Sequence, residues 1–219
     1  MAIQRFSPSI TRLNAEDLDR WSQIPVAVAG DALNRMNLMQ NRIRPVTSAK
    51  NFTGQAFTVD AFHGDNSAIH VALKSVQDGD VLVINGGGLQ DRALWGSILN
   101  QIAKRQGVRG VIIDGAVRDV DELEDHGHPV LAAGISPAGP SKGWGGAING
   151  PVSCGGVVVH PGDLIHGDAD GVVVIPQSRI AETFKTAEAR LGAEQDIVSR
   201  INQGEFTADI FGIDQIEDL

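Results

Sequence analysis

Short aliphatic runs alternate with glycine- and aspartate-rich turns along most of the chain after residue 50. Runs of this kind, bounded by turn residues, are typical of strands that are buried on one or both faces. The pattern predicts strands at residues 54–62, 80–85, 108–114, 128–134, 155–163 and 171–176. The acidic, turn-rich stretch 161–176 is in addition typical of a hairpin.

Apolar residues recur at helical spacing between some of these strands and towards both ends of the chain. In the stretch 66–76, for example, Ile69, Ala72 and Leu73 share one helix face. The predicted helices cover residues 14–24, with Asn14 as N-cap, 29–39, 66–76, 97–106 and about 178–203. The last is one long amphipathic helix, and an acidic tail with several large apolar residues follows it. We expect that tail to pack on a surface.

Strands and helices interleave in the first half of the chain, whereas strands cluster between residues 128 and 176. This distribution predicts a mixed α/β layer fold with a β-rich half. The chain carries no internal repeat, linker or low-complexity tract. We therefore expect a single domain over residues 1–219, with its core at about 25–176.

Charge and composition exclude several classes of function. A net charge of −9 argues against nucleic-acid binding, which needs a basic surface. Cys154 is the only cysteine, so neither a disulfide framework nor a thiolate metal cluster is expected. The first residues lack the apolar stretch of a signal peptide, and no apolar run has the length of a membrane span. We expect a cytoplasmic protein without a membrane partner.

Any metal site in this chain is expected to use oxygen ligands. The histidines are dispersed, and no cluster of cysteine and histidine occurs. Hard cations such as Mg²⁺ or Mn²⁺ are bound by carboxylate and water oxygens and need no such cluster. None of the lysines lies within an apolar strand, so activation of a carbonyl group would depend on an arginine and a metal rather than on a Schiff base.

A glycine-rich stretch at residues 84–100 is the first candidate for a binding site. A predicted strand ends in three glycines, and helical spacing resumes after Gly96, which places a helix start there with Ser97 as its N-cap. The free N–H groups and partial positive charge of a helix start attract carboxylate or phosphate groups. The same glycines are also consistent with a tight strand-to-helix connection.

The stretch 112–122, IIDGAVRDVDE, is the second candidate. Asp119 and Glu122 have the spacing of a capping box at a helix start, which requires no ligand. Capping does not explain Arg118, because a cation is disfavoured near a helix N-terminus. At a strand end, Arg118 and Asp119 can instead converge on one point, the carboxylate on a metal and the guanidinium on a substrate carboxylate or keto oxygen. The residues alone leave both interpretations open.

Taken together, these stretches resemble the RraA-like family, which contains the regulator of ribonuclease activity A and the 4-hydroxy-4-methyl-2-oxoglutarate (4-carboxy-4-hydroxy-2-oxoadipate) aldolases. The resemblance covers roughly residues 25–205. It rests on the segments GDALNRMNLMQNRIRP, GQAFTV, GDNSAIHVAL, GDVLVINGGG, ALWGSIL, GVIIDGAVRDVDEL, GISPAGP and PGDLIHGDADGVVVIP. It implies a swivelling β/β/α-type fold with mixed sheets and a long C-terminal helix. It also implies a homotrimer or a dimer of trimers, with active sites between subunits.

The resemblance further implies roles for individual residues. Arg118 would bind the substrate, and Asp119 would ligate the divalent metal, Mg²⁺ or Mn²⁺. A glutamate from the C-terminal helix of a neighbouring subunit would help to hold a water ligand of the metal, and Glu194 is the best match for it. Glu122 would either cap its helix or support the site from outside. The amides that would hold the carboxylate of a pyruvyl group lie at the helix start formed by Gly96, Ser97, Ile98 and Leu99.

One position departs from the aldolase pattern. The family's aldolases carry an aspartate where this chain has Ser97, ahead of the Arg118–Asp119 pair. That aspartate is associated with proton exchange between a water and the substrate, and the ribonuclease-regulator branch also lacks it. The departure therefore bears directly on which reaction the chain can catalyse.

The resemblance implies a divalent-metal-dependent lyase that cleaves a C–C bond of a 2-oxo acid through a pyruvate enolate. Such a class II pyruvate aldolase would cleave 4-hydroxy-4-methyl-2-oxoglutarate or 4-carboxy-4-hydroxy-2-oxoadipate, decarboxylate oxaloacetate, or do both. Retro-aldol cleavage also requires a base for the 4-hydroxyl, and Ser97 supplies no carboxylate for this. We therefore expect decarboxylation to be favoured over aldol cleavage relative to the family members that carry aspartate at this position. The alternative is a non-enzymatic protein of the RraA type that binds and inhibits an RNA-processing enzyme.

Overall fold

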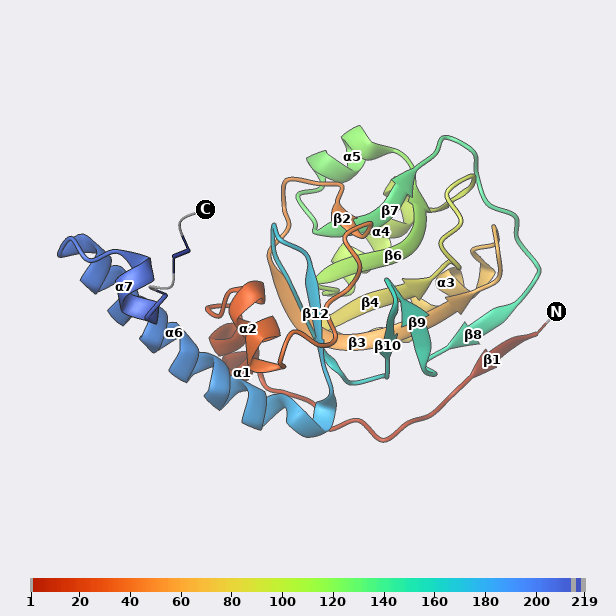
Figure 1. Cartoon of the computed structure of the whole chain (residues 1–219). Helices are drawn as coiled ribbons and strands as arrows, with labels where there is room; N and C mark the ends of the chain where they lie inside the picture. The colour runs from red at the N-terminus through yellow and green to blue at the C-terminus, as the bar shows by residue number, and fades with distance from the viewer. Residues whose placement is uncertain (1, 214–215, 218–219) are drawn as a thin grey trace.

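A mixed sheet with four parallel strands at its centre organises the chain (Figure 1). The structure, a computed structural model, describes residues 2–213 and 216–217. The main path of the sheet runs β1-β8-β3-β4-β6-β7-β2, with β11, β12 and β5 paired at its sides, and β9 and β10 form a separate hairpin. The strands are β1 (Ile3–Arg5), β2 (Arg44–Pro45), β3 (Phe52–Ala61), β4 (Asp80–Asn85), β5 (Ala93–Trp95), β6 (Gly110–Val117), β7 (Val130–Ile135), β8 (Gly146–Ile148), β9 (Val152–Cys154), β10 (Val157–Val159), β11 (Leu164–Gly167) and β12 (Val172–Ile175).

The central strands β3, β4, β6 and β7 are buried on both faces, which explains their nearly continuous aliphatic sequences. In β4, Leu82 and Ile84 face one core cluster, whereas Val81 and Val83 face another on the opposite side. The first cluster lies under helices α3, α4 and α5, and the second lies under β9, β10 and the β11–β12 hairpin.

The helices form two groups. Three short ones cover one face of the central sheet, while α1, α2 and the first half of α6 pack on the outer face of the β11–β12 hairpin. The helices are α1 (Ala15–Trp21), α2 (Val26–Ala32), α3 (Ser67–Ala72), α4 (Ser97–Arg105), α5 (Val120–Asp125), α6 (Ile180–Asn202) and α7 (Thr207–Phe211), with a 3-10 turn, η1 (Gln177–Arg179), before α6. Among the described residues, no helix is long and apolar enough to cross a membrane.

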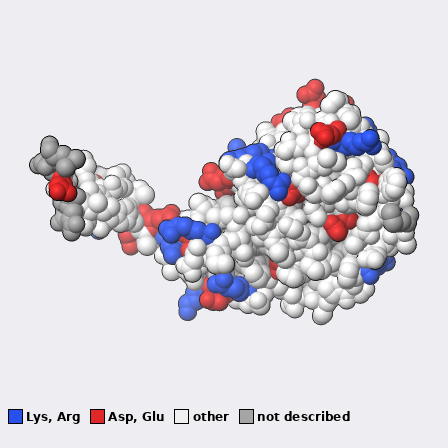
Figure 2. All heavy atoms as spheres, turned by 45° about the vertical axis from the view of Figure 1, so that its right-hand side comes forward, with Lys and Arg blue, Asp and Glu red and all other residues white. Residues whose placement is uncertain are grey.

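The second half of α6 and the segment that includes α7 project from the body of the molecule (Figures 1 and 2). Their large apolar side chains are exposed, with Phe206 at 74% and Phe211 at 58% of full exposure. The expected packing of the tail is therefore not found on this chain's own surface for the residues described. Residues 214–215 and 218–219 of the tail lie outside the described part.

Most predicted elements are confirmed, including the mixed α/β architecture, the hairpin of β11 and β12 and the long C-terminal helix. The predicted helix at 29–39 is wrong in position, because α2 ends at Ala32 and Asn34, Arg35 and Asn37 adopt positive φ angles. The predicted strand 155–163 is too long, because Gly155 and Gly156 form the turn between β9 and β10.

Candidate functional site

Two neighbouring strands bring the main candidate residues to one edge of the sheet. β5 and β6 run parallel, so their carboxyl ends lie side by side. β5 leads through Gly96 into α4, and β6 leads through Arg118 and Asp119 into α5. The starts of these two helices are therefore adjacent, although the sequence between them includes the whole of α4 and β6.

Asp119 adopts the left-handed conformation, with φ 58° and ψ 46°, at the N-cap position of α5. Its side chain caps nothing in α5, so the predicted capping box with Glu122 is wrong. Its Oδ2 instead accepts a hydrogen bond from the backbone N–H of Ser97, at 3.0 Å. A non-glycine residue in this region costs of order 1–3 kcal/mol, and such strain concentrates at functional sites.

Gly96 allows this close approach. A Cβ atom on Gly96 would lie 2.4 Å from Asp119 Oδ2, which is far inside van der Waals contact. Gly96 is also the N-cap residue of α4, and Ser97 is the first residue of the helix. The prediction that Ser97 is the N-cap is therefore wrong, because the Asp119 carboxylate takes the part that a capping side chain would play.

Arg118 is held at its backbone and extends across the same opening. Its N–H donates to the carbonyl of Trp95 at 3.0 Å, and its Nε lies 3.6 Å from Asp119 Oδ2. The guanidinium passes close to Gly139, where a Cβ would lie 2.9 Å from Nη1. Its side chain is 40% exposed, and that of Asp119 is 30% exposed, so both are open to a ligand.

These groups line a cavity of about 160 Å³, which we call the Arg118 cavity. Its cationic side chains, Arg118 and Lys142, outnumber its one carboxylate, which favours an anionic ligand. Burial lowers the pKa of the neighbouring His70, and Lys142 lowers it further while Asp65 opposes this, so His70 adds no charge at neutral pH. The lining residues are Asn66, His70, Ala93, Leu94, Trp95, Gly96, Ile98, Leu99, Arg118, Asp119, Pro140 and Lys142.

Asn66 lines this cavity and was not predicted from the sequence. It is 4% exposed, and its Nδ2 donates to the carbonyl of Leu94 at 3.2 Å. Its Oδ1 has no hydrogen-bond partner among the described residues, which is uncommon for a buried polar atom. Asn66 precedes α3 in a segment that has the pattern of an ordinary helix start, so the sequence carries no signal for this role.

The other predicted residues are placed differently. Gly96, Ile98 and Leu99 line the cavity, and Ile98 is 68% exposed beside it. Ser97 is half-buried behind the lining and contributes its backbone N–H to Asp119. Glu122 is exposed on α5 and Glu194 is exposed on α6, and neither lines the cavity of its own chain.

The donor groups at Asp119 fit a hard divalent cation that keeps most of its water. Within the described residues, no group of three or more histidine, cysteine, aspartate or glutamate side chains gathers around one point. Mg²⁺ is commonly held by one or two carboxylates together with waters and substrate oxygens. The partly exposed Asp119 carboxylate beside the cavity suits that mode of binding, whereas a structural metal site would need several protein ligands.

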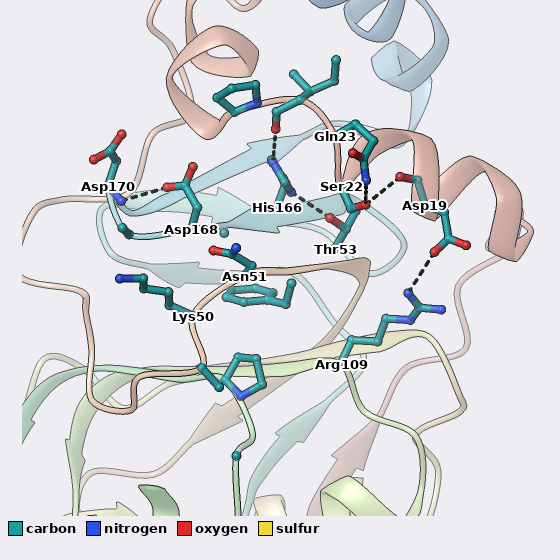
Figure 3. Close-up of a pocket in the computed structure, with 18 residues that line it drawn as sticks. Asp19, Ser22, Gln23, Lys50, Asn51, Thr53, Arg109, His166, Asp168 and Asp170 are labelled. Atoms are coloured by element: carbon teal, nitrogen blue, oxygen red, sulfur yellow. Dashed lines mark hydrogen bonds and ion pairs between the residues drawn. The ribbon is translucent and has the colours of Figure 1, made fainter.

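A larger cleft lies elsewhere, between the N-terminal helices and the turn of the β11–β12 hairpin (Figure 3). This large cleft has a volume of about 860 Å³, but its polar side chains are mainly bonded to one another or to the backbone. His166, for example, bonds to Thr53 at 2.8 Å and to the carbonyl of Ile24 at 2.6 Å. Asp168 accepts hydrogen bonds from the N–H groups of Val26 and Asp170.

The fold and the site together define a mixed α/β protein with an Arg-Asp pair beside a helix N-terminus. Over residues 26–174 the sequence matches the family model named RraA-like, described as Aldolase/RraA. The chain therefore belongs to the RraA-like family.

Individual relatives agree with this assignment. The chain is 36% identical over 173 residues to a protein of Halalkalibacterium halodurans named "Putative 4-hydroxy-4-methyl-2-oxoglutarate aldolase", covering 79% of this chain and 82% of that protein. An uncharacterised protein from Pseudomonas syringae pv. tomato has a similar structure, with TM-score 0.79, 27% identity and coverage of 92% and 95% of the two chains. A Streptomyces coelicolor protein, described as an unusual member of the RNase ES inhibitor RraA family, has TM-score 0.77, 28% identity and coverage of 86% and 100%.

Proposed function

We propose that this protein is a divalent-metal-dependent lyase that cleaves a C–C bond of a 2-oxo acid through a pyruvate enolate. The observation that carries the proposal is the convergence of Arg118, Asp119 and the first turn of α4 on one small cavity. The similarity to a protein named as an aldolase supports the same reaction class. The excess of cationic side chains in the cavity suits a substrate with more than one carboxylate.

The first turn of α4 would bind the carboxylate next to the keto group. The N–H groups of Ile98 and Leu99 lie in that turn, where no preceding helical carbonyl is available to them. The helix dipole adds a partial positive charge at the same end. Arg118 would donate to the keto oxygen, on which negative charge develops as the C–C bond breaks.

Asp119 would hold the divalent cation, Mg²⁺ or Mn²⁺. When bound, such an ion supplies electrophilic stabilisation of an enolate oxygen. The carboxylate accepts a hydrogen bond from the Ser97 N–H, and the missing side chain of Gly96 leaves room for it in this position. Its orientation therefore does not depend on the ligand. We further propose that Glu194 approaches this site from a neighbouring subunit of a trimer or a dimer of trimers, since it lies far along the projecting α6.

The residue at position 97 should determine which of two reactions through this enolate is faster. In decarboxylation of oxaloacetate, the bond between C3 and the departing carboxylate breaks, CO₂ leaves, and the electron pair forms the pyruvate enolate, which then takes a proton. In retro-aldol cleavage, the 4-hydroxyl must also lose a proton as the C3–C4 bond breaks, and this needs a base. Ser97 carries no such group, so we expect decarboxylation to exceed aldol cleavage.

The substitution Ser97→Asp tests this expectation. We expect the variant to raise cleavage of 4-hydroxy-4-methyl-2-oxoglutarate by about 10-fold or more, because a positioned base contributes roughly 10²–10⁴-fold. Pyruvate release, coupled to lactate dehydrogenase, measures both reactions with Mg²⁺ and with EDTA. Ser97→Asn is the matched control, since asparagine has the same shape as aspartate but no carboxylate. This variant should leave the ratio of the two reaction rates unchanged.

If the wild-type protein releases pyruvate from neither substrate in the presence of Mg²⁺ or Mn²⁺, the proposed lyase function is wrong. The second candidate is then a binding protein that inhibits an RNA-processing enzyme. The absence of an acid at Ser97 and the likeness to the Streptomyces coelicolor protein favour that candidate. Inhibition of a purified ribonuclease E-type enzyme by the protein would support it.

A further inference from the structure

A buried amide behind the Arg118 cavity connects the two helices that form it. Asn100 lies one turn into α4 and is fully buried, at 0% exposure. A fully buried amide is expected to satisfy its hydrogen-bonding groups within the protein. Here the partners come from three elements outside α4.

The first partner is Trp95, the last residue of β5. Its indole Nε1–H points to Asn100 Oδ1 at 3.4 Å, and its carbonyl accepts the hydrogen bond from the Arg118 N–H. Trp95 therefore joins the side chain of Asn100 to the backbone of Arg118. It also directly precedes Gly96, whose position under the Asp119 carboxylate allows no room for a side chain.

The second and third partners are His126 and His128. Asn100 Nδ2 lies 3.0 Å from Nδ1 of His126, the C-cap residue directly after α5. Asn100 Oδ1 lies 2.8 Å from Nδ1 of His128, at the entrance to β7, and the other ring nitrogen of His128 lies 2.7 Å from the Val108 carbonyl. Lys104, also in α4, donates to the carbonyl of His126.

These contacts fix α4 against α5 at two places. At the cavity, the Ser97 N–H donates to Oδ2 of Asp119, the N-cap residue of α5. One helical turn further along α4, Asn100 bonds to His126, the C-cap residue of α5. Two contacts at different depths restrict rotation and sliding of one helix against the other, which neither contact can do alone. Together, the two contacts set the distance from the backbone amides at the start of α4 to Asp119 and Arg118.

We infer that Asn100 is a positioning residue that holds the carboxylate-binding turn of α4 in register with the Arg118–Asp119 pair. This inference rests on the proposed function for its effect on catalysis, but the contact it predicts is measurable without turnover. A displacement of about 1 Å between groups that bind two ends of one substrate can cost roughly 10²-fold in rate. The effect should therefore appear in kcat, because each half of the site still binds its part of the substrate.

The test compares two buried amides with similar numbers of partners. Asn100→Leu removes all the hydrogen bonds of Asn100 and nearly preserves its shape. Gln55→Leu is the matched control, because Gln55 in β3 is 1% exposed and bonds to the backbone of Leu13, Thr11 and Gly162, away from the cavity. Both variants leave buried polar groups unpaired, so both should lose stability.

Only Asn100→Leu should change the site. We expect its kcat for oxaloacetate to fall at least about 10-fold with KM within about 3-fold of wild type, and Asn100→Asp, which keeps Oδ1 for Trp95 and His128, should recover part of this loss. Gln55→Leu should keep kcat within about 2-fold at the same fraction folded. His126→Ala removes one contact from a half-buried position and should lower kcat in the same direction, which keeps the test informative if Asn100→Leu does not fold.

Amide hydrogen exchange at Ser97 gives a readout independent of catalysis, since this N–H bonds to Asp119. We expect exchange at Ser97 to be faster in Asn100→Leu and His126→Ala than in wild type, and unchanged in Gln55→Leu. Equal exchange and equal kcat in the Asn100 and Gln55 variants would overturn the inference. If wild type has no activity while exchange at Ser97 still depends on Asn100, the proposed function fails and the positioning role stands.

Discussion

The Arg118 cavity and the large cleft differ in what their polar groups are bonded to. The cleft has more than five times the volume, about 860 Å³ against 160 Å³, and also contains charged residues. Asp168 accepts hydrogen bonds from two backbone N–H groups, Asp19 lies 3.8 Å from Arg109, and His166 is bonded at both ring nitrogens. Its buried and half-buried polar groups are accounted for by the fold, whereas Lys50, Asn51 and Asp170 are exposed to solvent.

In the small cavity the fold leaves polar groups open and holds one residue under strain. Asn66 has a buried Oδ1 without a partner among the described residues, and Asp119 is left-handed with only a backbone N–H on its carboxylate and Arg118 Nε at 3.6 Å. The size of a cavity therefore says less about function here than the state of the polar groups on its wall.

The largest effect on activity is expected when an aspartate is replaced by asparagine in the Arg118 cavity, and the same replacement in the large cleft should have little effect. Asp119→Asn should lower pyruvate release by roughly 10³-fold, because it removes the carboxylate that would hold the divalent cation. The bound cation would stabilise the transition state by several kcal/mol. Asparagine tolerates the left-handed conformation, so thermal unfolding should change little. Asp170→Asn in the large cleft is the control and should leave activity within about 2-fold. Equal activity in the two variants would contradict the assignment of the site.

Gly96→Ala should have the next largest effect. Its Cβ would displace the Asp119 carboxylate, and a misplacement of about 1 Å can cost on the order of 10²-fold in kcat. Gly192→Ala in α6 is the control for stability, since nothing in the chain lies within 4 Å of the position that its Cβ would take, and it should stabilise the protein by about 0.5–1 kcal/mol. Full activity in Gly96→Ala would show that the Asp119 position is not required.

The smallest expected effect is on the pH dependence of folding stability, through His166 in the large cleft. Burial lowers the pKa of His166 below its ordinary value of 6.5, although its backbone hydrogen bonds and Asp168 oppose this. The unfolded chain therefore binds the proton first, so the stability contributed by His166 is fully present above pH 6.5 and is lost as the pH falls through the folded-state pKa. In urea unfolding between about pH 7.5 and 5.5, we expect His166→Gln to lose less stability than wild type.

Activity of His166→Gln at pH 7.5 should match wild type at the same fraction folded. His70 and His128 remain in the variant, and burial lowers their pKa values too, so part of the pH dependence should persist. An unchanged slope in His166→Gln would show that this histidine is not neutral in the folded protein.

The sequence predicts the strands well because the central sheet is buried on both faces, which demands unbroken aliphatic runs such as Val81–Ile84. It identifies Arg118 and Asp119 as a pair because they are adjacent and follow a strand. It fails where a residue takes its partner from a distant segment. The spacing of Asp119 and Glu122 fits a capping box, and only the fold shows that the carboxylate binds Ser97 instead.

Asn66 and Asn100 are beyond sequence patterns for the same reason. Each is a polar residue in a short amphipathic helix or at its start, where an exposed position is the usual expectation. Their roles depend on Leu94, Trp95 and His126, which come close only after β5 and α5 are in place. Hydrophobic spacing carries no information on such contacts.

The two ends of the main strand path have a consequence for self-association. β1 and β2 occupy those ends, are three and two residues long, and each includes an arginine; β2 also includes Pro45, which has no N–H to offer. Short, charged or proline-containing terminal strands are poor templates for adding another chain by β-pairing. Copies of this protein are thereby discouraged from growing into continuous sheets along this path.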